Sequence, residues 1–300
     1  MNKKKRNVID KAHELFIEQG YHATSIQDIL NHSGISKGSF YNYFPSKSEL
    51  FKAVFNLLLE NMQMERDKLL IGESVGDINV FKEQISFIMK LNKKNKLNQL
   101  IDDVLVSSDP DLIKFIKQFK LLFLHWVYER FLDIFPRDKE VYLMDCAVIF
   151  TGVMQNILYT SHALQTTFKM DEMVNYSMDR VITILEDVST KEIHLFESQK
   201  LNTLLPQSDY NDFFNNEFSI ATVNLKKVIE KIFILEEQKT ATYINLLYFI
   251  QEEIMNNKEP RNFLIESALS TLKSTEELKD LTEYLQYEHV LANMNYYPIS

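Results

Sequence analysis

The stretch that decides the fold spans residues 20–47 and reads GYHATSIQDILNHSGISKGSFYNYFPSK. It contains two short segments with helical signals, separated by the turn Ser33-Gly34-Ile35. Two short helices joined by a turn that contains Gly form a helix-turn-helix, and its second helix can enter a major groove about 12 Å wide. These residues therefore predict a helix-turn-helix at residues 24–44.

Hydroxyl side chains mark where the two helices begin. Either Ser25 with Asp28 or Thr24 with Gln27 can form a capping box at the first helix, and Ser36 can cap the second. Isolated helices shorter than about 12–15 residues are marginal in water, because nucleation is costly. The pair must therefore pack into one small bundle with its neighbours.

Two further helices flank this pair. An apolar stripe over residues 8–16 predicts a helix that ends at Gly20, because glycine readily adopts the left-handed conformation of a helix C-cap. Ser46 and Glu49 can form another capping box, and apolar residues at helical spacing follow it through Leu58. A compact helical bundle is therefore expected at the N-terminal end.

Composition sets the fold class of the whole chain. The 300 residues are 45% hydrophobic and 25% charged, which is typical of a soluble globular protein of about two domains. Six Gly and six Pro leave little turn chemistry for β-hairpins. The sequence therefore predicts an all-α fold, with an N-terminal helix-turn-helix three-helix bundle and a larger helical domain.

Charge is distributed unevenly along the chain. Through Lys52 there are eight Lys or Arg and five Asp or Glu, a formal charge of +3, whereas the remaining residues carry −12. Salt screens charge beyond about 8–10 Å, so a local basic face can neutralise phosphates although the chain as a whole is acidic. The N-terminal bundle is therefore where a polyanionic partner is expected.

Several classes of protein are disfavoured. The single cysteine, Cys146, cannot close an intrachain disulfide and fits a reducing compartment. No apolar run approaches 18 residues, and Asp10 and Glu14 interrupt what would be a signal peptide. We find no Gly-rich phosphate loop, H-x-x-E metal pair or nucleophile elbow. A cytoplasmic protein is expected, with no membrane partner, cofactor or bound metal and no enzyme activity.

The N-terminal residues resemble a known family over about residues 7–55. The matching residues are Gly20-Tyr21-His22-Ala23-Thr24-Ser25-Ile26, Ile29, Gly34-Ile35-Ser36-Lys37-Gly38-Ser39-Phe40-Tyr41-Asn42-Tyr43-Phe44, Lys47 and Leu50. This pattern resembles the DNA-binding domain of the TetR family of bacterial repressors. It departs from the family at Ser33, where Ala is common, and at the variable positions Asn42 and Pro45. The resemblance implies a homodimer on a palindromic operator in double-stranded DNA, released by a small apolar effector.

The resemblance also implies which residues contact DNA, mostly at phosphates. The predicted DNA-binding residues are Thr24, Ser25, Ser36, Lys37, Gly38, Ser39, Tyr41, Asn42, Tyr43 and Lys47. Thr24 and Ser25 would offer hydroxyls and amides of a helix start to a phosphate. Gly38 would let the backbone approach the duplex, and Lys47 would hold the DNA backbone.

Other residues of the bundle have a simpler explanation. Phe40 and Phe44 are expected in the core, and Tyr43 fits packing as well as DNA contact. The basic run at residues 3–6 is either a solvated tail or a flexible arm on DNA. His22 and His32 lie on different helix faces without a third ligand, so a metal site is not expected there.

The acidic remainder reads as helices separated at prolines. Four helices are predicted in one bundle at Asn98–Ser107, Asp111–Phe135, Lys139–Phe168 and Asp171–Val188. The resemblance implies that the last two pair with a second copy, with Gly152 allowing close approach. It also implies a ligand cavity, for which the predicted residues are Phe119, Phe123, Trp126, Tyr159 and His162. Most of this aromatic mass equally fits ordinary core.

The family pattern ends near residue 190, which gives three expected domains: residues 1–52, 53–190 and 191–300. Helical spacing in the last domain predicts helices at Ile220–Glu236, Thr240–Met255, Arg261–Lys273 and Thr275–Glu288. Two hypotheses remain for this extension. The favoured one is a helical extension packed on the body and dimer seam. The alternative is a module that binds a protein partner and replaces the small effector in regulation.

Overall fold

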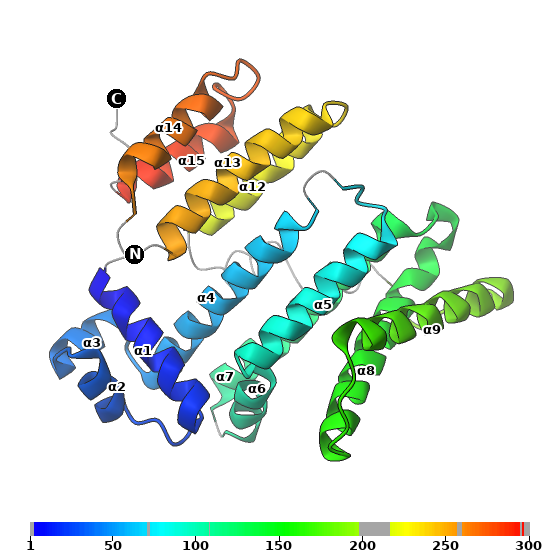
Figure 1. The fold of residues 1–300 in the computed structure, drawn as a ribbon, viewed down its shortest axis with the longest axis horizontal. Coiled ribbons are helices and arrows are strands. Elements are labelled where there is room, and N and C mark those ends of the chain that lie inside the picture. Colours follow the sequence, from blue (N-terminus) through cyan, green and yellow to red (C-terminus); the bar gives the residue numbers. More distant parts are fainter. Residues whose placement is uncertain are drawn as a thin grey trace. The chain divides into compact units, whose positions relative to one another are not determined.

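The computed structural model describes residues 3–70, 73–107, 109–197, 217–256, 260–294 and 296. These residues form α-helices and one short 3-10 helix, and no strand occurs among them (Figure 1). The predicted all-α fold class is therefore confirmed for the described part of the chain.

The N-terminal bundle has the predicted helices. They are α1 (Lys3–Gln19), α2 (Ile26–Ser33), α3 (Lys37–Tyr43) and α4 (Lys47–Lys68). Gly20 ends α1 with φ +86°, and its N–H donates to the carbonyl of Phe16. The basic run at residues 3–6 forms the first turn of α1, so neither a solvated tail nor a flexible arm describes it.

The central helices follow in the order expected from the proline breaks. They are α5 (Ile78–Lys94), α6 (Leu97–Val106), α7 (Pro110–Ile134), the 3-10 helix Arg137–Lys139, α8 (Glu140–Ala163) and α9 (Met170–Lys191). Helix α5 is not predicted from the sequence as a separate helix. Helix α8 ends five residues before the predicted Phe168, since Leu164 N–H closes the last turn and Gln165 takes a positive φ of 52°. Helix α8 packs against α7 and α9, and α9 also packs against α5.

The C-terminal helices are α12 (Glu217–Ile232), α13 (Glu237–Asn256), α14 (Asn262–Lys273) and α15 (Thr282–Asn293). The first three lie where the spacing predicts them. The predicted start of the fourth at Thr275 is wrong by seven residues. Leu278 is fully buried in a turn before α15, so an apolar residue at helical spacing was mistaken for part of the helix.

The chain divides into two compact units, and each is described by itself. The larger unit contains the described residues of Asp10–Phe55 and Glu73–Tyr210. The C-terminal unit contains those of Met1–Ile9, Asn56–Gly72 and Asn211–Ser300. Helices α1 and α4 each contribute residues to both units. The three domains expected from the sequence remain a prediction.

Aromatic residues dominate the core of the larger unit. The ring of Phe55 from α4 contacts Phe115 and Phe119 of α7, with centroids 5.6 and 5.1 Å apart. Phe81 of α5 contacts Phe150 of α8 at 5.6 Å. These contacts tie α4, α5, α7 and α8 together through the central helices.

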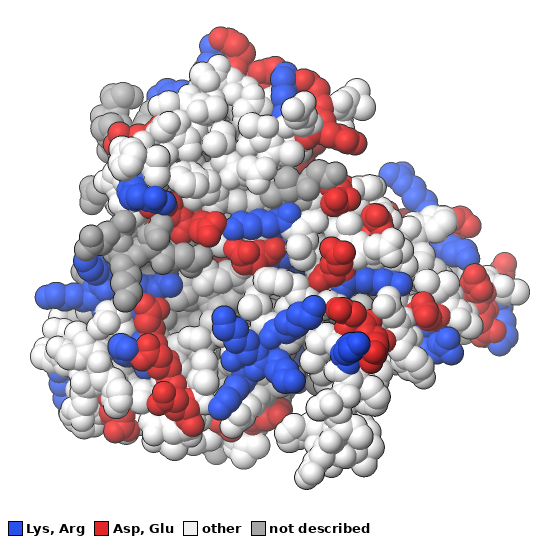
Figure 2. Space-filling view, in the orientation of Figure 1, with Lys and Arg blue, Asp and Glu red and all other residues white. Residues whose placement is uncertain are grey.

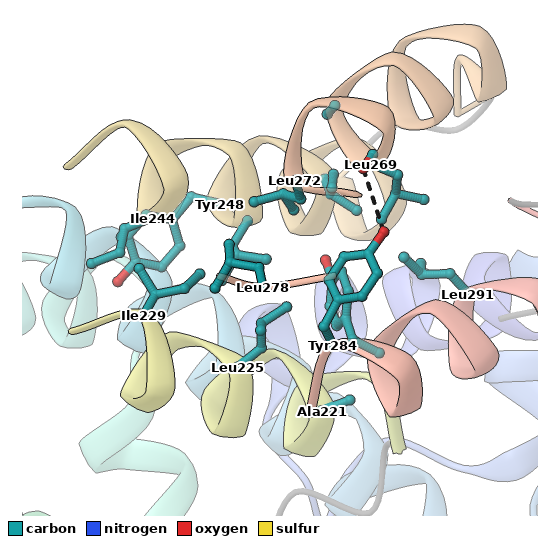
Figure 3. Packing of buried hydrophobic residues seen from close by; sticks show 14 of the residues in the cluster. Ala221, Leu225, Ile229, Ile244, Tyr248, Leu269, Leu272, Leu278, Tyr284 and Leu291 are labelled. Atoms are coloured by element: carbon teal, nitrogen blue, oxygen red, sulfur yellow. Dashed lines mark hydrogen bonds between the residues drawn. The ribbon is translucent and has the colours of Figure 1, made fainter. Parts of the chain in front are cut away.

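The C-terminal unit has its own hydrophobic core, drawn in Figure 3. Leu225 of α12, Tyr248 of α13, Leu269 of α14 and Tyr284 of α15 meet there, and the Tyr284 hydroxyl donates to the Leu269 carbonyl at 3.5 Å. Met64 of α4 belongs to the same buried cluster. The extension therefore forms a core with the second half of α4.

One helical stretch contains a long apolar window. Within the described residues, Arg137–Ala163 is long and apolar enough to cross a membrane by length and composition, with a mean hydropathy of 1.5 and 39% of the window buried. The buried helix of a soluble protein passes the same test, and α8 packs on two neighbouring helices. The exposed remainder of this stretch is considered below as an interface between two copies.

Candidate nucleic-acid interface

Helix α2 begins with the predicted capping box of Ser25 and Asp28. The Ser25 hydroxyl accepts the Asp28 N–H at 3.1 Å and donates to its carboxylate at 2.6 Å, and that carboxylate also accepts the Ser25 N–H at 2.9 Å. These bonds from Ser25 hold the pKa of Asp28 below its ordinary value. Ser25 is exposed, so its side chain lies at the surface where α2 begins.

Thr24 has a different position from the one predicted. It is fully buried, and its hydroxyl donates to the Gly20 carbonyl at 2.8 Å. The alternative capping box with Gln27 is therefore wrong. The hydroxyl also faces away from solvent, so Thr24 does not join the exposed surface in this structure. Its buried side chain instead closes the corner between α1 and α2.

The turn between α2 and α3 follows the predicted geometry. Gly34 has φ +70°, and its N–H donates to the Leu30 carbonyl at 2.9 Å, which caps α2. Ser36 caps α3 by accepting the Ser39 N–H at 3.2 Å, and the two hydroxyls are 3.0 Å apart. The sequence therefore fixes both helix ends through local hydrogen bonds.

Helix α3 presents an exposed face that begins at its first turn. Lys37, Gly38, Tyr41 and Asn42 are exposed, whereas Phe40 is fully buried as expected for the core. Ser39 and Tyr43 are half-buried. The predicted residues of this helix therefore lie at the surface in whole or in part.

Gly38 is the most informative residue on this face. A Cβ built on it would meet no atom within 4 Å, and its backbone is helical. Glycine within a helix is less favourable than alanine by about 0.8–1.0 kcal/mol. No described atom around Gly38 therefore requires a glycine at this position.

Lys47 is more deeply placed than a surface phosphate clamp. Its ammonium donates to the carbonyls of Tyr21 and Thr24 at 3.0 Å each and lies 4.3 Å from the centre of the Tyr21 ring. Burial lowers the pKa of this lysine. Lys47 thus fixes the segment that precedes α2. An ammonium has three donors, so one remains beyond these two bonds.

The central helices hold this bundle through bonds that the sequence did not suggest. Asp103 of α6 accepts the Tyr21 N–H at 3.2 Å, and its carbonyl lies 2.9 Å from His22 Nε2. Lys96, just before α6, donates to the Ile17 carbonyl at 3.0 Å. Both ends of α6 therefore hold the corner where α1 meets α2. Such contacts join residues about 80 positions apart and leave no local pattern.

The two histidines considered as metal ligands make other contacts. His22 lies against the Asp103 carbonyl, and His32 Nδ1 lies 2.9 Å from the Asp28 carbonyl. Among the described residues there is no group of three His, Cys, Asp or Glu arranged to hold a metal ion. His22 therefore contacts α6, and His32 contacts the backbone of its own helix.

The five residues predicted to bind a ligand separate into two groups. Phe119, Phe123 and Trp126 are half-buried on α7, and the ring centres of Phe123 and Trp126 are 5.9 Å apart. Tyr159 is 75% exposed and His162 is also exposed, near the end of α8. Their assignment to a cavity with the α7 aromatics is not supported, because the second half of α8 carries them to the surface.

Comparison with known proteins agrees with the geometry of the bundle. Residues 8–54 match the family described as "Bacterial regulatory proteins, tetR family". The chain is 23% identical to YuxN, an uncharacterized HTH-type transcriptional regulator of Bacillus subtilis (strain 168), over 96% of this chain and 98% of the relative. It is also 23% identical to the HTH-type regulator YerO of the same strain, over 98% of this chain and all of the relative.

A third relative matches a smaller share of the chain. The HTH-type transcriptional repressor DhaR of Mycobacterium sp. (strain GP1) is 27% identical over 29% of this chain and 43% of the relative. YuxN and YerO, by contrast, align through the C-terminal extension. Residues 8–54 therefore form a helix-turn-helix domain of the TetR type, and the chain as a whole is similar to two HTH-type transcriptional regulators.

Proposed function

We propose that the protein is a homodimeric repressor that acts in the cytoplasm, binds a palindromic operator and is released by a small apolar effector. The observation that carries the DNA-binding part is Gly38, an exposed helical glycine with free space around it at the start of α3. A glycine at this position lets a phosphate backbone approach the backbone of α3 closely, because no Cβ stands between them.

The proposed DNA face consists of residues from the start of α2, from α3 with its N-cap, and from the start of α4. Its members are Ser25, Ser36, Lys37, Gly38, Ser39, Tyr41, Asn42, Tyr43 and Lys47, without the buried Thr24. Lys37 supplies positive charge at the exposed first turn of α3, and Tyr41 is 44% exposed. Lys47 would contribute the third proton of its ammonium. These groups suit phosphates and base edges, and phosphate contacts fix register on the duplex.

The proposed dimer forms through α8 and α9. Large apolar residues are exposed along these helices and the segments beside them: Val141, Tyr159, Leu164, Phe168 and Tyr176. Gly152 in the middle of α8 would accept a Cβ without meeting any atom within 4 Å. Exposed apolar surface of this kind marks an interface, and a bare glycine lets a second helix approach. Two copies would place recognition helices about 34–36 Å apart, one turn of duplex.

The proposed effector site uses the α7 aromatics. Phe119 contacts Phe55 of α4, and Trp126 contacts Phe81 of α5, at centroid distances of 5.1 and 5.8 Å. An apolar molecule inserted among these rings would move α4, whose first turns belong to the DNA-binding bundle. It would release DNA only to the extent that it binds the two conformations with different affinity.

Selection from a random library of DNA duplexes tests the proposal. The full-length protein should enrich a palindrome, and a repressor should lower transcription from a promoter that carries it. With about six to eight phosphate contacts per dimer, the logarithm of affinity should fall with the logarithm of salt concentration at a slope of about −5 to −7. Failure to enrich any duplex, or a slope near zero, would refute the proposed face.

A further inference from the structure

Helix α4 takes part in two cores. Near its start, Lys47 bonds to the carbonyls of Tyr21 and Thr24, and Leu50 and Phe51 are buried in the larger unit. Its second half, from Asn56 onward, belongs to the C-terminal unit. Helix α4 is one uninterrupted helix of 22 residues, about 33 Å long, so residues of both units lie on the same helix.

A buried charge pair attaches this second half to the extension. The carboxylate of Asp67 lies 3.2 Å from the ammonium of Lys226 on α12 and 2.7 Å from the guanidinium of Arg66. The side chains of Asp67 and Lys226 are each only 17% exposed. Lys226 also lies 5.4 Å from the centre of the Tyr248 ring on α13. Two helices of the extension thus meet one turn of α4.

Each partner keeps the other charged. Burial alone would raise the pKa of Asp67, but Arg66 and Lys226 hold it below its ordinary value. Burial alone would lower the pKa of Lys226, but Asp67 and Tyr248 raise it above its ordinary value. Both groups therefore remain ionised. Removing Lys226 would leave Asp67 with Arg66 alone, and removing Asp67 would leave Lys226 with the more distant carboxylate of Glu230 at 3.8 Å, so either change weakens the compensation of a buried charge.

The pair also restricts how α4 can slide along α12, which apolar contacts alone would restrict less. Met64 lies one turn before Asp67 on α4 and is 2% exposed in the cluster with α12–α15. Apolar side chains tolerate small sliding movements between packed helices. A charged pair with defined hydrogen bonds permits one arrangement, as buried polar residues do at helix interfaces in other systems.

We propose that the C-terminal unit sets the position of α4 for DNA binding, with Asp67 and Lys226 as positioning residues. The extension would thereby contribute to DNA binding through the position of α4. This inference rests on the proposed function, because it assumes a dimer that reads two half-sites at a fixed separation. It assigns a role to helices that the family match at residues 8–54 does not include.

The test compares full-length variants on the duplex that the unaltered protein selects from a random library. Lys226→Met removes one charge, and Asp67→Leu combined with Lys226→Met replaces the pair by apolar side chains. Asp67→Asn is a milder single change, in case Lys226→Met does not fold. Lys273→Met is the matched control, since the Lys273 side chain is 43% exposed and pairs with Glu288 of the same unit. Helicity and unfolding midpoint are recorded for every variant.

A positioning role predicts an effect on half-site spacing as well as on affinity. At a temperature where it is fully folded, Lys226→Met should bind the duplex at least tenfold more weakly, and Asp67→Asn about threefold. The double variant should regain part of the unfolding midpoint, because Arg66 still loses the Asp67 carboxylate, but it should lose spacing discrimination. Inserting one base pair between the half-sites should cost the unaltered protein at least tenfold and the double variant less than threefold. Lys273→Met should stay within twofold throughout.

The opposite outcome is equally clear. If the fully folded single variants bind within twofold of the unaltered protein, or if the double variant keeps the full spacing penalty, the pair only stabilises the fold and the inference is wrong. If the unaltered protein selects no duplex, the proposed function fails instead, and the two failures are thereby separated.

Discussion

The carboxylate of Asp103 accepts the backbone N–H of Tyr21 at 3.2 Å, and this bond joins α6 to the corner that precedes the helix-turn-helix. The same carboxylate oxygen lies 2.8 Å from where a Cβ on Gly20 would be. Gly20 is therefore required twice, once for its φ of +86° and once for the close approach of Asp103.

Replacing Gly20 with Ala should destabilise the protein by more than the same change at Gly34. Both glycines have positive φ, which costs a residue with a Cβ about 1–2 kcal/mol. Only Gly20 adds a collision with Asp103, since the space around Gly34 is open. Denaturant unfolding of both variants measures the difference, and Asp103→Ala in the Gly20→Ala background should reduce it. Equal destabilisation by the two glycine variants would show that the close approach is unimportant.

Lys47→Ala should weaken binding to all duplex sequences alike. The lost ammonium removes one phosphate contact from each protomer, two per dimer, so the salt slope should become shallower by about 2. It also frees the carbonyls of Tyr21 and Thr24, which loosens the segment before α2. Lys52→Ala is the control, since Lys52 pairs with Glu49 on the surface of the same helix. A change in sequence preference would contradict the positioning role.

Local chemistry explains why so much of the bundle was predictable. The capping box at Ser25, the left-handed Gly34 and the cap at Ser36 each depend on residues within four positions of one another. The sequence therefore places α2 and α3 to within one residue at the start of α2. The choice between Ser25 and Thr24 as the cap could not be made, because both have a suitable acidic or amide partner three residues later.

Long-range packing explains what the sequence did not show. The bond from Asp103 to Tyr21 and the pair of Asp67 with Lys226 join residues 82 and 159 positions apart. The spacing of apolar residues along the sequence does not predict contacts over such distances in the chain. Tyr159 was assigned to a cavity on its residue type, but the direction in which α8 presents it depends on where α7 and α9 pack. Thr24 was placed on the DNA face for its hydroxyl, which the α1–α2 corner buries.

A bulky residue at Gly152 should prevent dimerisation without unfolding the chain. Gly152→Leu adds a side chain where no atom of the same chain lies within 4 Å, and leucine favours the helix by about 0.8 kcal/mol over glycine. Sedimentation analysis should show at least a tenfold weaker dimer with an unchanged or higher unfolding midpoint. Lys117→Leu, at an exposed position of α7, provides the control. A dimer of unaltered affinity would exclude this part of α8 from the interface.

The account depends most on the claim that α3 approaches DNA with its backbone at Gly38, and Gly38→Ala tests this directly. Alanine should raise the free energy of unfolding by about 0.5–1 kcal/mol, because it favours the helix and meets no neighbouring atom. Affinity for the selected duplex should fall at least tenfold in the same preparation. A variant that is more stable and still binds the duplex as tightly as the unaltered protein would contradict the account.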